Sequence, residues 1–375
     1  MKAIGVIVEY NPFHNGHKHH LDEAKKLSNS DCVIAVMSGN FVQRGEPAII
    51  NKWDRARLAI ENGIDLVIEL PFVYSVQSAD IFAFGAIDIL NKLKIRELYF
   101  GSESNDIDSL KEIVSTFNTV EYQTLIKKYL DEGNNYPSAS GKTVYDITKR
   151  KFTSNDNLGI QYIKSINKLK SSIEPKTIQR VHSNYHDKES DHASIASATA
   201  IRLMDDPFQY VPKNTYEALK GNTYTWNNYY ELLQYKIISD PDLEKLAFVE
   251  EGIENRFKKC IHANSFEEFL NKVYTRRYTH NRIRRTLINI LCNIKKDDYS
   301  ELNLLNGVPY IRILAMNENG RKYLNLNKKE IETPILSKAS EINNKMMDIE
   351  VRATEIYDKS LLENEFKPLI YKLKS

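Results

Sequence analysis

The stretch Val8-Glu-Tyr-Asn-Pro-Phe-His-Asn-Gly-His17 decides the fold of this chain of 375 residues. It follows an apolar, β-branched run at residues 3–8, which is typical of a buried strand. A helical pattern begins close to its end, near residue 15. Strand, tight turn and helix start are therefore predicted in immediate succession, and the start of a helix binds phosphate through its free N–H groups.

Two histidines occupy this predicted phosphate position, His14 and His17, with Gly16 between them. Glycine lets the backbone approach a nucleotide closely, and two imidazoles can stabilise the charge that develops on the α-phosphate and the leaving pyrophosphate. The spacing predicts adenylyl transfer. The competing interpretation is a histidine-rich surface loop, because His19 and His20 follow directly.

Strand and helix patterns alternate through the first two hundred residues. Buried strands are predicted at residues 3–8, 31–37, 65–70, 97–100 and 176–181. Strands separated by helices form a parallel sheet with right-handed crossovers. The predicted class is therefore α/β, with a doubly wound, five-stranded, Rossmann-like nucleotidyltransferase sheet.

Three loops follow the carboxyl ends of predicted strands, at residues 9–17, 38–47 and 101–104. Ligands of parallel α/β sheets bind beyond these strand ends, so we expect the three loops to converge on a nucleotide. Beyond residue 205 the pattern changes to helices without intervening buried strands. We therefore predict a catalytic domain at 1–204 and a mainly α-helical domain at 205–375.

The composition argues against a highly basic nucleic-acid-binding protein, a membrane-spanning protein and a disulfide-rich protein. The 52 basic and 50 acidic residues nearly balance, so any basic surface is local. No stretch approaches the roughly 18 consecutive apolar residues of a membrane span. Cys32, Cys260 and Cys292 are widely spaced in apolar surroundings, which indicates reduced thiols in a cytoplasmic protein without a disulfide framework or zinc site.

A second candidate phosphate site lies at residues 194–202. Ser197 and Thr199 stand close before Arg202, and hydroxyls at a helix start followed by a guanidinium suit phosphate binding. An ordinary capped helix with a surface arginine is the competing interpretation. Taken together with the histidine pair, the phosphate interpretation is favoured.

Basic residues cluster around the start of a helix predicted near residues 279–295. Aromatic and histidine side chains, Tyr274, Tyr278 and His280, are interleaved with them. Such clusters are typical of contact with an RNA backbone and of base stacking. The alternative is a solvated basic helix face. The candidate RNA-binding residues are Lys272, Arg276, Arg277, Arg282, Arg284 and Arg285.

Two other motifs do not support a site. Gly141-Lys-Thr143 lacks the first glycine of a P-loop, because position 136 is Tyr136. The segment from His182 to His186, with Asp187, Asp191 and His192, has metal-ligating residue types. It has no cysteine and no evident supporting partners, so a charged loop is favoured over a metal site.

Longer strings resemble one known family. The 8–17 stretch, Met37-Ser-Gly-Asn-Phe-Val-Gln-Arg-Gly-Glu-Pro47 and Gly101-Ser-Glu103 are similar to motifs of the bacterial tRNA(Met) cytidine acetate ligases. These belong to the nucleotidyltransferase superfamily with the His-x-Gly-His motif. Asn155–Gly159, Arg180 and the region 275–285 fit as well, so the resemblance covers essentially the full chain.

The resemblance implies that ATP, with Mg²⁺, activates acetate to acetyl-adenylate. The acetyl group then passes to the 4-amino group of the wobble cytidine in elongator tRNA(Met). By position, the implied ATP site contains Ile7, Val8, Glu9, Tyr10, Asn11, Pro12, Phe13, His14, Asn15, Gly16, His17, Lys18, His19, His20, Gly101, Asn155 and Arg180. The family has Asn-Asn-Ile-Leu-Gly where this chain has Asn155-Asp-Asn-Leu-Gly159, and we retain Asn155 because it aligns without a shift.

Roles for individual residues follow from this implied reaction. Adenylation of a carboxylate needs no protein nucleophile, so positioning and electrostatics carry it. His14 and His17 are assigned to the phosphates, and Ser197, Thr199 and Arg202 to the β- and γ-phosphates. Ser38, Asn40 and Arg44 lie on the facing loop, where acetate or the target base is expected.

Two other functions remain open at the level of sequence. A small-molecule adenylyltransferase of the same superfamily would keep the ATP site but would need neither a long helical domain nor the arginine cluster. A non-catalytic RNA- or nucleotide-binding protein would not depend on His14.

Overall fold

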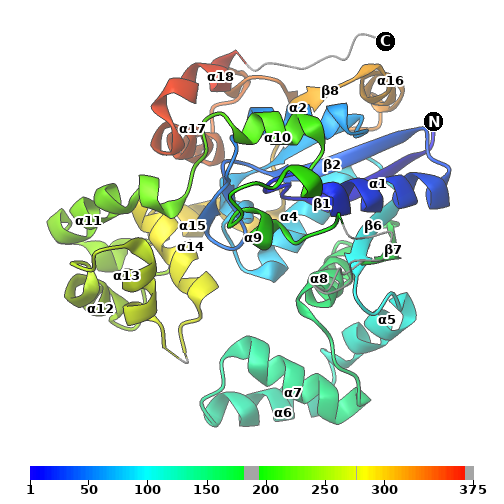
Figure 1. The fold of residues 1–375 in the computed structure, drawn as a ribbon. Helices are drawn as coiled ribbons and strands as arrows, with labels where there is room; N and C mark the ends of the chain where they lie inside the picture. Colours follow the sequence, from blue (N-terminus) through cyan, green and yellow to red (C-terminus); the bar gives the residue numbers. More distant parts are fainter. Residues whose placement is uncertain (181–193, 276, 368–375) are drawn as a thin grey trace.

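The fold is described from a computed structural model, which places residues 1–180, 194–275 and 277–367. Its centre is a seven-stranded sheet in the order β7-β6-β1-β2-β5-β8-β9 (Figure 1). The strands are β1 (Ala3–Val8), β2 (Cys32–Ser38), β5 (Leu66–Leu70), β6 (Glu97–Ser102), β7 (Glu174–Gln179), β8 (Ile311–Met316) and β9 (Ile335–Leu336). The first five are parallel, which confirms the predicted α/β class and the five predicted strands.

Two strands of this sheet were not predicted, and neither was the small antiparallel pair β3 (Phe41–Val42) and β4 (Glu46–Pro47) in the loop at 38–47. The β8 strand pairs antiparallel with β5, and β9 pairs parallel with β8. Both β8 and β9 come from the part of the chain beyond residue 205, which was expected to be mainly helical. That part therefore completes the sheet as well as adding helices. The division of the chain at residue 204 stays a prediction.

Helices cover both faces of the sheet, as a doubly wound fold requires. On one face, α1 (Asn15–Ser28) and α2 (Lys52–Glu61) pack through Leu21 and Ala56 against Val33 and Val67. On the other, α4 (Ala79–Lys92) and α8 (Ser154–Lys168) pack against the opposite side of the same strands. The alternation of side chains along a strand sends neighbouring residues of β2 to these two separate cores.

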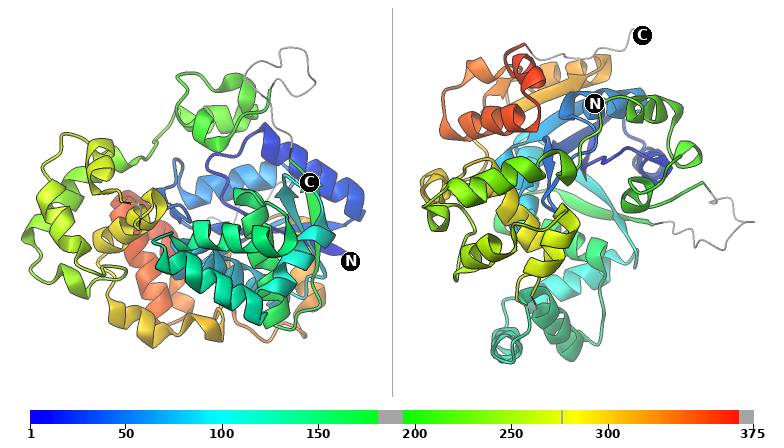
Figure 2. Two further views of the ribbon diagram at one scale, coloured as in Figure 1. Left: turned by 90° about the horizontal axis from the view of Figure 1, so that it is seen from below. Right: turned by 60° about the vertical axis from the view of Figure 1, so that its left-hand side comes forward.

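The remaining helices form additions to this centre (Figures 1 and 2). One group stands at the left of Figure 1 and contains α11 (Tyr230–Ser239), α12 (Ile253–Cys260), α13 (Phe266–Val273) and α14 (His280–Leu291). A helical hairpin of α6 (Val120–Asp131) and α7 (Tyr136–Thr148) projects at the bottom. The other helices are α3 (Phe72–Ser75), α5 (Ile107–Thr116), α9 (Ala198–Ile201), α10 (Lys213–Leu219), α15 (Lys296–Leu302), α16 (Glu318–Asn327), α17 (Lys345–Tyr357) and α18 (Leu362–Phe366).

None of the helices in the described ranges is long and apolar enough to cross a membrane. All three cysteines are free thiols.

A buried cluster of charges joins the sheet to the C-terminal helices. Lys52 Nζ lies 2.5 Å from Glu69 Oε1, 3.0 Å from Glu350 Oε1 and 2.7 Å from Glu365 Oε1. Arg312 of β8 lies 3.1 Å from Glu69 and also contacts Glu365. All five side chains are excluded from solvent. Burial alone would lower the pKa of Lys52, but the three carboxylates raise it above its ordinary value.

We expect Lys52→Met to lower the free energy of unfolding by about 3–5 kcal/mol, because it leaves buried carboxylates without their partner. Urea denaturation followed by circular dichroism measures this. The matched control is Lys176→Met, which removes an exposed partner of Glu174 and should cost far less. Equal losses in the two variants would contradict the importance of the buried cluster.

Candidate active site

The two motif histidines form a single stacked unit at the start of α1. His14 is the N-cap residue, and its Nδ1 accepts the backbone N–H of Gly16 at 3.1 Å. His17 Nδ1 in turn accepts the backbone N–H of His14 at 3.3 Å. The two rings stack with their centroids 3.7 Å apart. A Cβ on Gly16 would lie 2.9 Å from His14 Cε1, so a side chain at that position would disturb the stack.

These hydrogen bonds fix the protons of both rings. Because each Nδ1 accepts a hydrogen bond, the proton of each neutral ring belongs on Nε2. Burial, followed by the charge of Arg180, lowers the pKa of His14 to about 3. Burial also lowers the pKa of His17 well below its usual value and that of His20 to about 4. At neutral pH the histidines are therefore uncharged donors, and the positive charge beside them is that of Arg180.

Arg180, Gly101 and Asn155 come together around Glu103. The Asn155 amide donates to Glu103 Oε1, and Arg180 Nε lies 3.4 Å from the same oxygen. A Cβ on Gly101 would lie 3.1 Å from Arg180 Cγ, so the arginine passes closely over the glycine. Gly101, near the end of β6, and Arg180, directly after β7, were both predicted to bind ATP and are thus adjacent in space.

The departure from the family pattern at position 156 has a structural explanation. Asp156 accepts from Ser102 Oγ at 2.5 Å and from the backbone N–H of Thr153 at 3.4 Å, which caps α8. Its carboxylate is therefore engaged by the protein. Asn155 remains on the side of Glu103 and Arg180, which supports the choice of this asparagine.

The second candidate phosphate site, at residues 194–202, packs directly on the turn that carries His14 and His17. We call this turn the histidine turn. Asn15 Nδ2 donates to the carbonyl of Ser194 at 3.0 Å. Ser197 caps the short helix α9, since its hydroxyl accepts the N–H of Ala200. Arg202 donates to the carbonyl of Asn11 at 2.7 Å and pairs with Glu46 at 2.9 Å. Its guanidinium therefore ties the histidine turn to the loop at 38–47.

The loop at 38–47 faces the histidine turn, as predicted. Glu9 accepts the backbone N–H of Gln43 at 2.9 Å. Arg55, which sequence analysis did not identify, is buried and donates to the carbonyls of Glu9 (2.6 Å) and Gly39. These bonds, with those of Arg202, hold two of the three converging loops together. The third, at 101–104, joins them through Arg180, whose charge acts on the histidines.

Three residues of this loop were predicted to meet acetate or the target base. Ser38 is buried, and its hydroxyl has no hydrogen-bond partner in the described chain. Asn40 is fully engaged, because its Nδ2 donates to Thr354 at 3.0 Å and its Oδ1 accepts the N–H of Lys52 at 2.9 Å. Arg44 is exposed at the tip of the loop.

The candidate RNA-binding residues are mostly paired with the protein itself. Lys272 pairs with Glu268, Arg277 with Glu251, and Arg282 with Glu250. Arg284 lies 3.3 Å from Glu46, and Arg285 donates to the carbonyl of Gln43 at 3.4 Å. Burial, with the charge of Arg282, lowers the pKa of Arg285 to about 10. Arg276 lies outside the described residues.

No role was predicted for Arg55, Glu46 or Glu103. Each is an ordinary polar residue in the sequence, and only its distant partners reveal what it does. The segment 182–192, considered above for a metal, lies outside the described residues. Among the residues that the structure places, no group of three or more potential metal-ligating side chains occurs.

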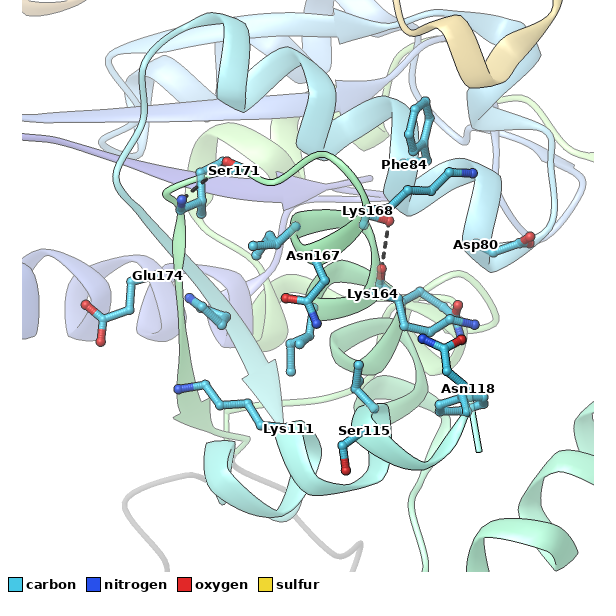
Figure 3. A pocket seen from close by; sticks show the side chains of 18 of the residues that line it. Asp80, Phe84, Lys111, Ser115, Asn118, Lys164, Asn167, Lys168, Ser171 and Glu174 are labelled. Atoms are coloured by element: carbon cyan, nitrogen blue, oxygen red, sulfur yellow. Dashed lines mark hydrogen bonds between the residues drawn. The ribbon is translucent and has the colours of Figure 1, made fainter. Parts of the chain in front are cut away.

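A cavity of about 1030 Å³ lies apart from the histidines, between α4, α5 and α8 (Figure 3). Its lining includes Asp80, Phe84, Lys111, Lys164 and Lys168. None of the candidate nucleotide-binding residues lines it. It is therefore a separate feature of the surface.

Comparison with known proteins agrees with this geometry. The HIGH Nucleotidyl Transferase family model matches residues 1–369. The chain is 42% identical over 378 residues to the tRNA(Met) cytidine acetate ligase of Anoxybacillus flavithermus, with 95% of this chain and 94% of the relative covered. The enzyme of that name from Listeria monocytogenes is 41% identical over 380 residues, with the same coverage of both chains. The chain belongs to the tRNA(Met) cytidine acetate ligase family.

Solved structures of the family have the same fold. Apo TmcAL of Thermotoga maritima superposes with a TM-score of 0.89 at 33% identity, over 100% of both chains. The same protein bound with alpha-thio ATP gives a TM-score of 0.87, also at 33% identity and full coverage of both chains. The predicted family and fold are confirmed.

The neutral histidines make a prediction about stability. An unfolded chain binds a proton at each histidine below about pH 6.5, whereas native His14 does so only near pH 3. The unfolding free energy should therefore fall as the pH is lowered from 6.5 to 4.5, by up to about 1.4 kcal/mol per pH unit for each such histidine. His14→Asn keeps an acceptor for Gly16 and removes the titrating group, so its slope should be smaller by about one proton. Urea titrations at several pH values measure both slopes, and identical slopes would contradict a neutral His14.

Proposed function

We propose that this protein is an ATP-dependent tRNA(Met) cytidine acetate ligase. It activates acetate as acetyl-adenylate and acetylates the 4-amino group of the wobble cytidine in elongator tRNA(Met). The observation that carries the proposal is the stacked pair His14–His17 at the start of α1 beside Arg180, in a chain that matches relatives of that name over 95% of its length. We place the enzyme in the cytoplasm, where ATP, acetate and tRNA meet.

The first step is an in-line displacement at the α-phosphate. A carboxylate oxygen of acetate attacks phosphorus, and the bond to pyrophosphate breaks. The Nε2–H groups of His14 and His17 donate to the phosphate oxygens as charge develops, with the guanidinium of Arg180 close by. The free N–H groups at the start of α1 add to the positive potential. Because His14 and His17 are neutral before ATP binds, they present hydrogen-bond donors to the phosphates and carry no positive charge of their own.

The remaining nucleotide contacts follow the family pattern. The segment Ile7 to His20, with Gly101 and Asn155, surrounds the nucleotide. Ser197, Thr199 and Arg202 hold the β- and γ-phosphates, which is supported by the packing of residues 194–202 on the histidine turn. Mg²⁺ accompanies ATP, since this ion is usually bound through substrate phosphates together with few protein ligands.

Acetate and the acceptor base occupy the side of the loop at 38–47. The buried, unpartnered hydroxyl of Ser38 is available to acetate. Arg44, exposed at the loop tip, meets the anionic substrate or the tRNA. Asn40 serves the site by holding the loop, because both ends of its amide are already bonded.

Transfer requires the cytidine amino group to attack the mixed anhydride, with AMP as the leaving group. The base must be unstacked to reach the cleft, and a base in an anticodon loop is unstacked at low cost. The basic residues at 272–285, which run from the end of α13 into the first turns of α14, approach the tRNA. Arg284 and Arg285 of α14 already touch the loop at 38–47.

Acetate-dependent exchange between ATP and pyrophosphate tests the first step. We expect His17→Asn to lower the exchange rate by roughly 10²–10³-fold, as for loss of one donor to a developing oxyanion. His262→Asn, an exposed histidine outside the site, is the matched control and should keep the wild-type rate. Labelled acetylcytidine in tRNA incubated with ATP and radioactive acetate tests the second step.

The outcomes separate the alternatives. Exchange with another acid but not with acetate would leave a small-molecule adenylyltransferase. Absence of exchange with any acid in folded protein would indicate a binding protein. Either result would overturn the proposed function.

A further inference from the structure

The hairpin of α6 and α7 carries unpaired cations around exposed aromatic rings. Lys142, Asp146 and Lys149 follow the i, i+4, i+7 spacing of one face of α7, and Tyr145 lies beside them. Lys149 Nζ lies 5.9 Å and Lys151 Nζ 5.6 Å from the centre of the Tyr145 ring, which is 43% exposed. Lysines around an exposed tyrosine are typical of surfaces that bind single-stranded nucleic acid.

A second tyrosine extends this arrangement to α6. Lys128 Nζ and Lys142 Nζ lie 5.8 and 5.3 Å from the centre of the Tyr129 ring. The Tyr129 hydroxyl donates to Asp146, the one carboxylate on this face of α7. That carboxylate is therefore engaged by the tyrosine and is not paired with a lysine.

Lys128, Lys142, Lys149 and Lys151 form no ion pair with any carboxylate in the part of the chain that the structure places. Some exposed lysines elsewhere do pair with a neighbouring acid, as Lys220 does with Glu217. The candidate arginines of α14 are also paired. The four lysines of the hairpin therefore present positive charge that no described carboxylate neutralises.

The segment after α7 connects the hairpin to the active site. Arg150 is held on α5 by Glu112 (2.9 Å) and Asp106 (3.7 Å). Two residues beyond Lys151, the Thr153 hydroxyl donates to Glu103, which also contacts Asn155 and lies 3.4 Å from Arg180. Lys149 and Lys151 thus flank an anchored arginine at the edge of the nucleotide site.

We propose that the surface formed by Lys128, Lys142, Tyr145, Lys149 and Lys151 binds RNA and is a second contact for the tRNA. Its lysines bind phosphates, and the ring of Tyr145 stacks on an unpaired base or ribose. The inference rests on the proposed function, because a tRNA whose anticodon enters the cleft must pass the edge at which Lys149 and Lys151 stand. In Figure 1 and in the right-hand view of Figure 2, the hairpin lies below the sheet, on the same side as α14.

Binding of an unmodified elongator tRNA(Met) transcript at several KCl concentrations tests the proposal. Lys149→Ala combined with Lys151→Ala should weaken binding roughly tenfold at 0.1 M KCl. The slope of log K against log salt should become shallower by about 0.7 to 0.9 for each phosphate that the variant no longer neutralises. The matched control is Lys328→Ala with Lys329→Ala, which removes the same charge from exposed positions at the end of α16, at the opposite end of the molecule (Figure 1).

Tyr145 provides an independent variant. Tyr145→Ala should weaken tRNA binding at least fivefold because the base no longer stacks on a ring, whereas Tyr145→Phe should bind as the wild type does. Wild-type affinity and salt slope in the double lysine variant would overturn the proposal, as would an equal loss in the control variant.

The two proposals fail differently. Acetate-dependent ATP–pyrophosphate exchange does not involve tRNA. If exchange proceeds and the lysine variants bind tRNA normally, only the RNA surface is wrong. If the wild type shows no exchange, the proposed function fails, while the binding curves still decide whether the hairpin contacts RNA.

Discussion

The ammonium group of Lys52 lies out of contact with solvent between three carboxylates, and most of the architecture meets at this point. Glu69 comes from the end of β5, Glu350 from α17 and Glu365 from α18, while Arg312 of β8 closes the cluster. A buried charge that loses its partner costs several kcal/mol, so none of these elements moves independently of the others. The cluster contains three carboxyl groups and two cationic side chains. Burial and the neighbouring Glu350 raise the pKa of Glu69, while Lys52 and Arg312 oppose this shift.

This cluster also reaches the active site. The backbone of Lys52 and the hydroxyl of Thr354 hold the two ends of the Asn40 amide, and a Cβ on Gly39 would lie only 2.9 Å from Glu350 Oε1. On its other side the loop at 38–47 rests on α14, where a Cβ on Gly45 would lie 2.4 Å from the backbone nitrogen of Arg285. A reaction without a protein nucleophile depends on such pre-set geometry. The C-terminal helices therefore keep the loop at 38–47 in place beside the turn that carries His14 and His17.

The features that could be predicted from the sequence are those determined by neighbouring residues. The first four parallel strands along the chain contain short apolar runs, and the turn from Val8 to His17 contains its own cap and its own glycine. The β8 strand could not be assigned, because Ile311–Met316 becomes a strand by pairing with β5, which lies far away in the sequence. Lys52 at the start of a helix looks like a solvated residue until Glu350 is placed beside it. The arginines at 277–284 looked free for the same reason, since Glu46, Glu250 and Glu251 approach them from other segments.

Two arginines of α14 are paired with carboxylates, and the lysines of the α6–α7 hairpin are not paired with any in the described chain. This difference determines the free energy with which each group binds an RNA phosphate. For Arg282 to bind an RNA phosphate, it must exchange or share its carboxylate partner Glu250, so part of the interaction energy is lost in the exchange. Lys149 donates to the backbone carbonyl of Asp146 at 2.8 Å, but neither it nor Lys151 has a carboxylate partner among the described residues. The release of counterions from the RNA then favours binding. The unpaired lysines therefore supply most of the salt-dependent attraction. The paired arginines, held in fixed positions by their partners, are better suited to orient the tRNA once it has arrived, because their side chains are already ordered.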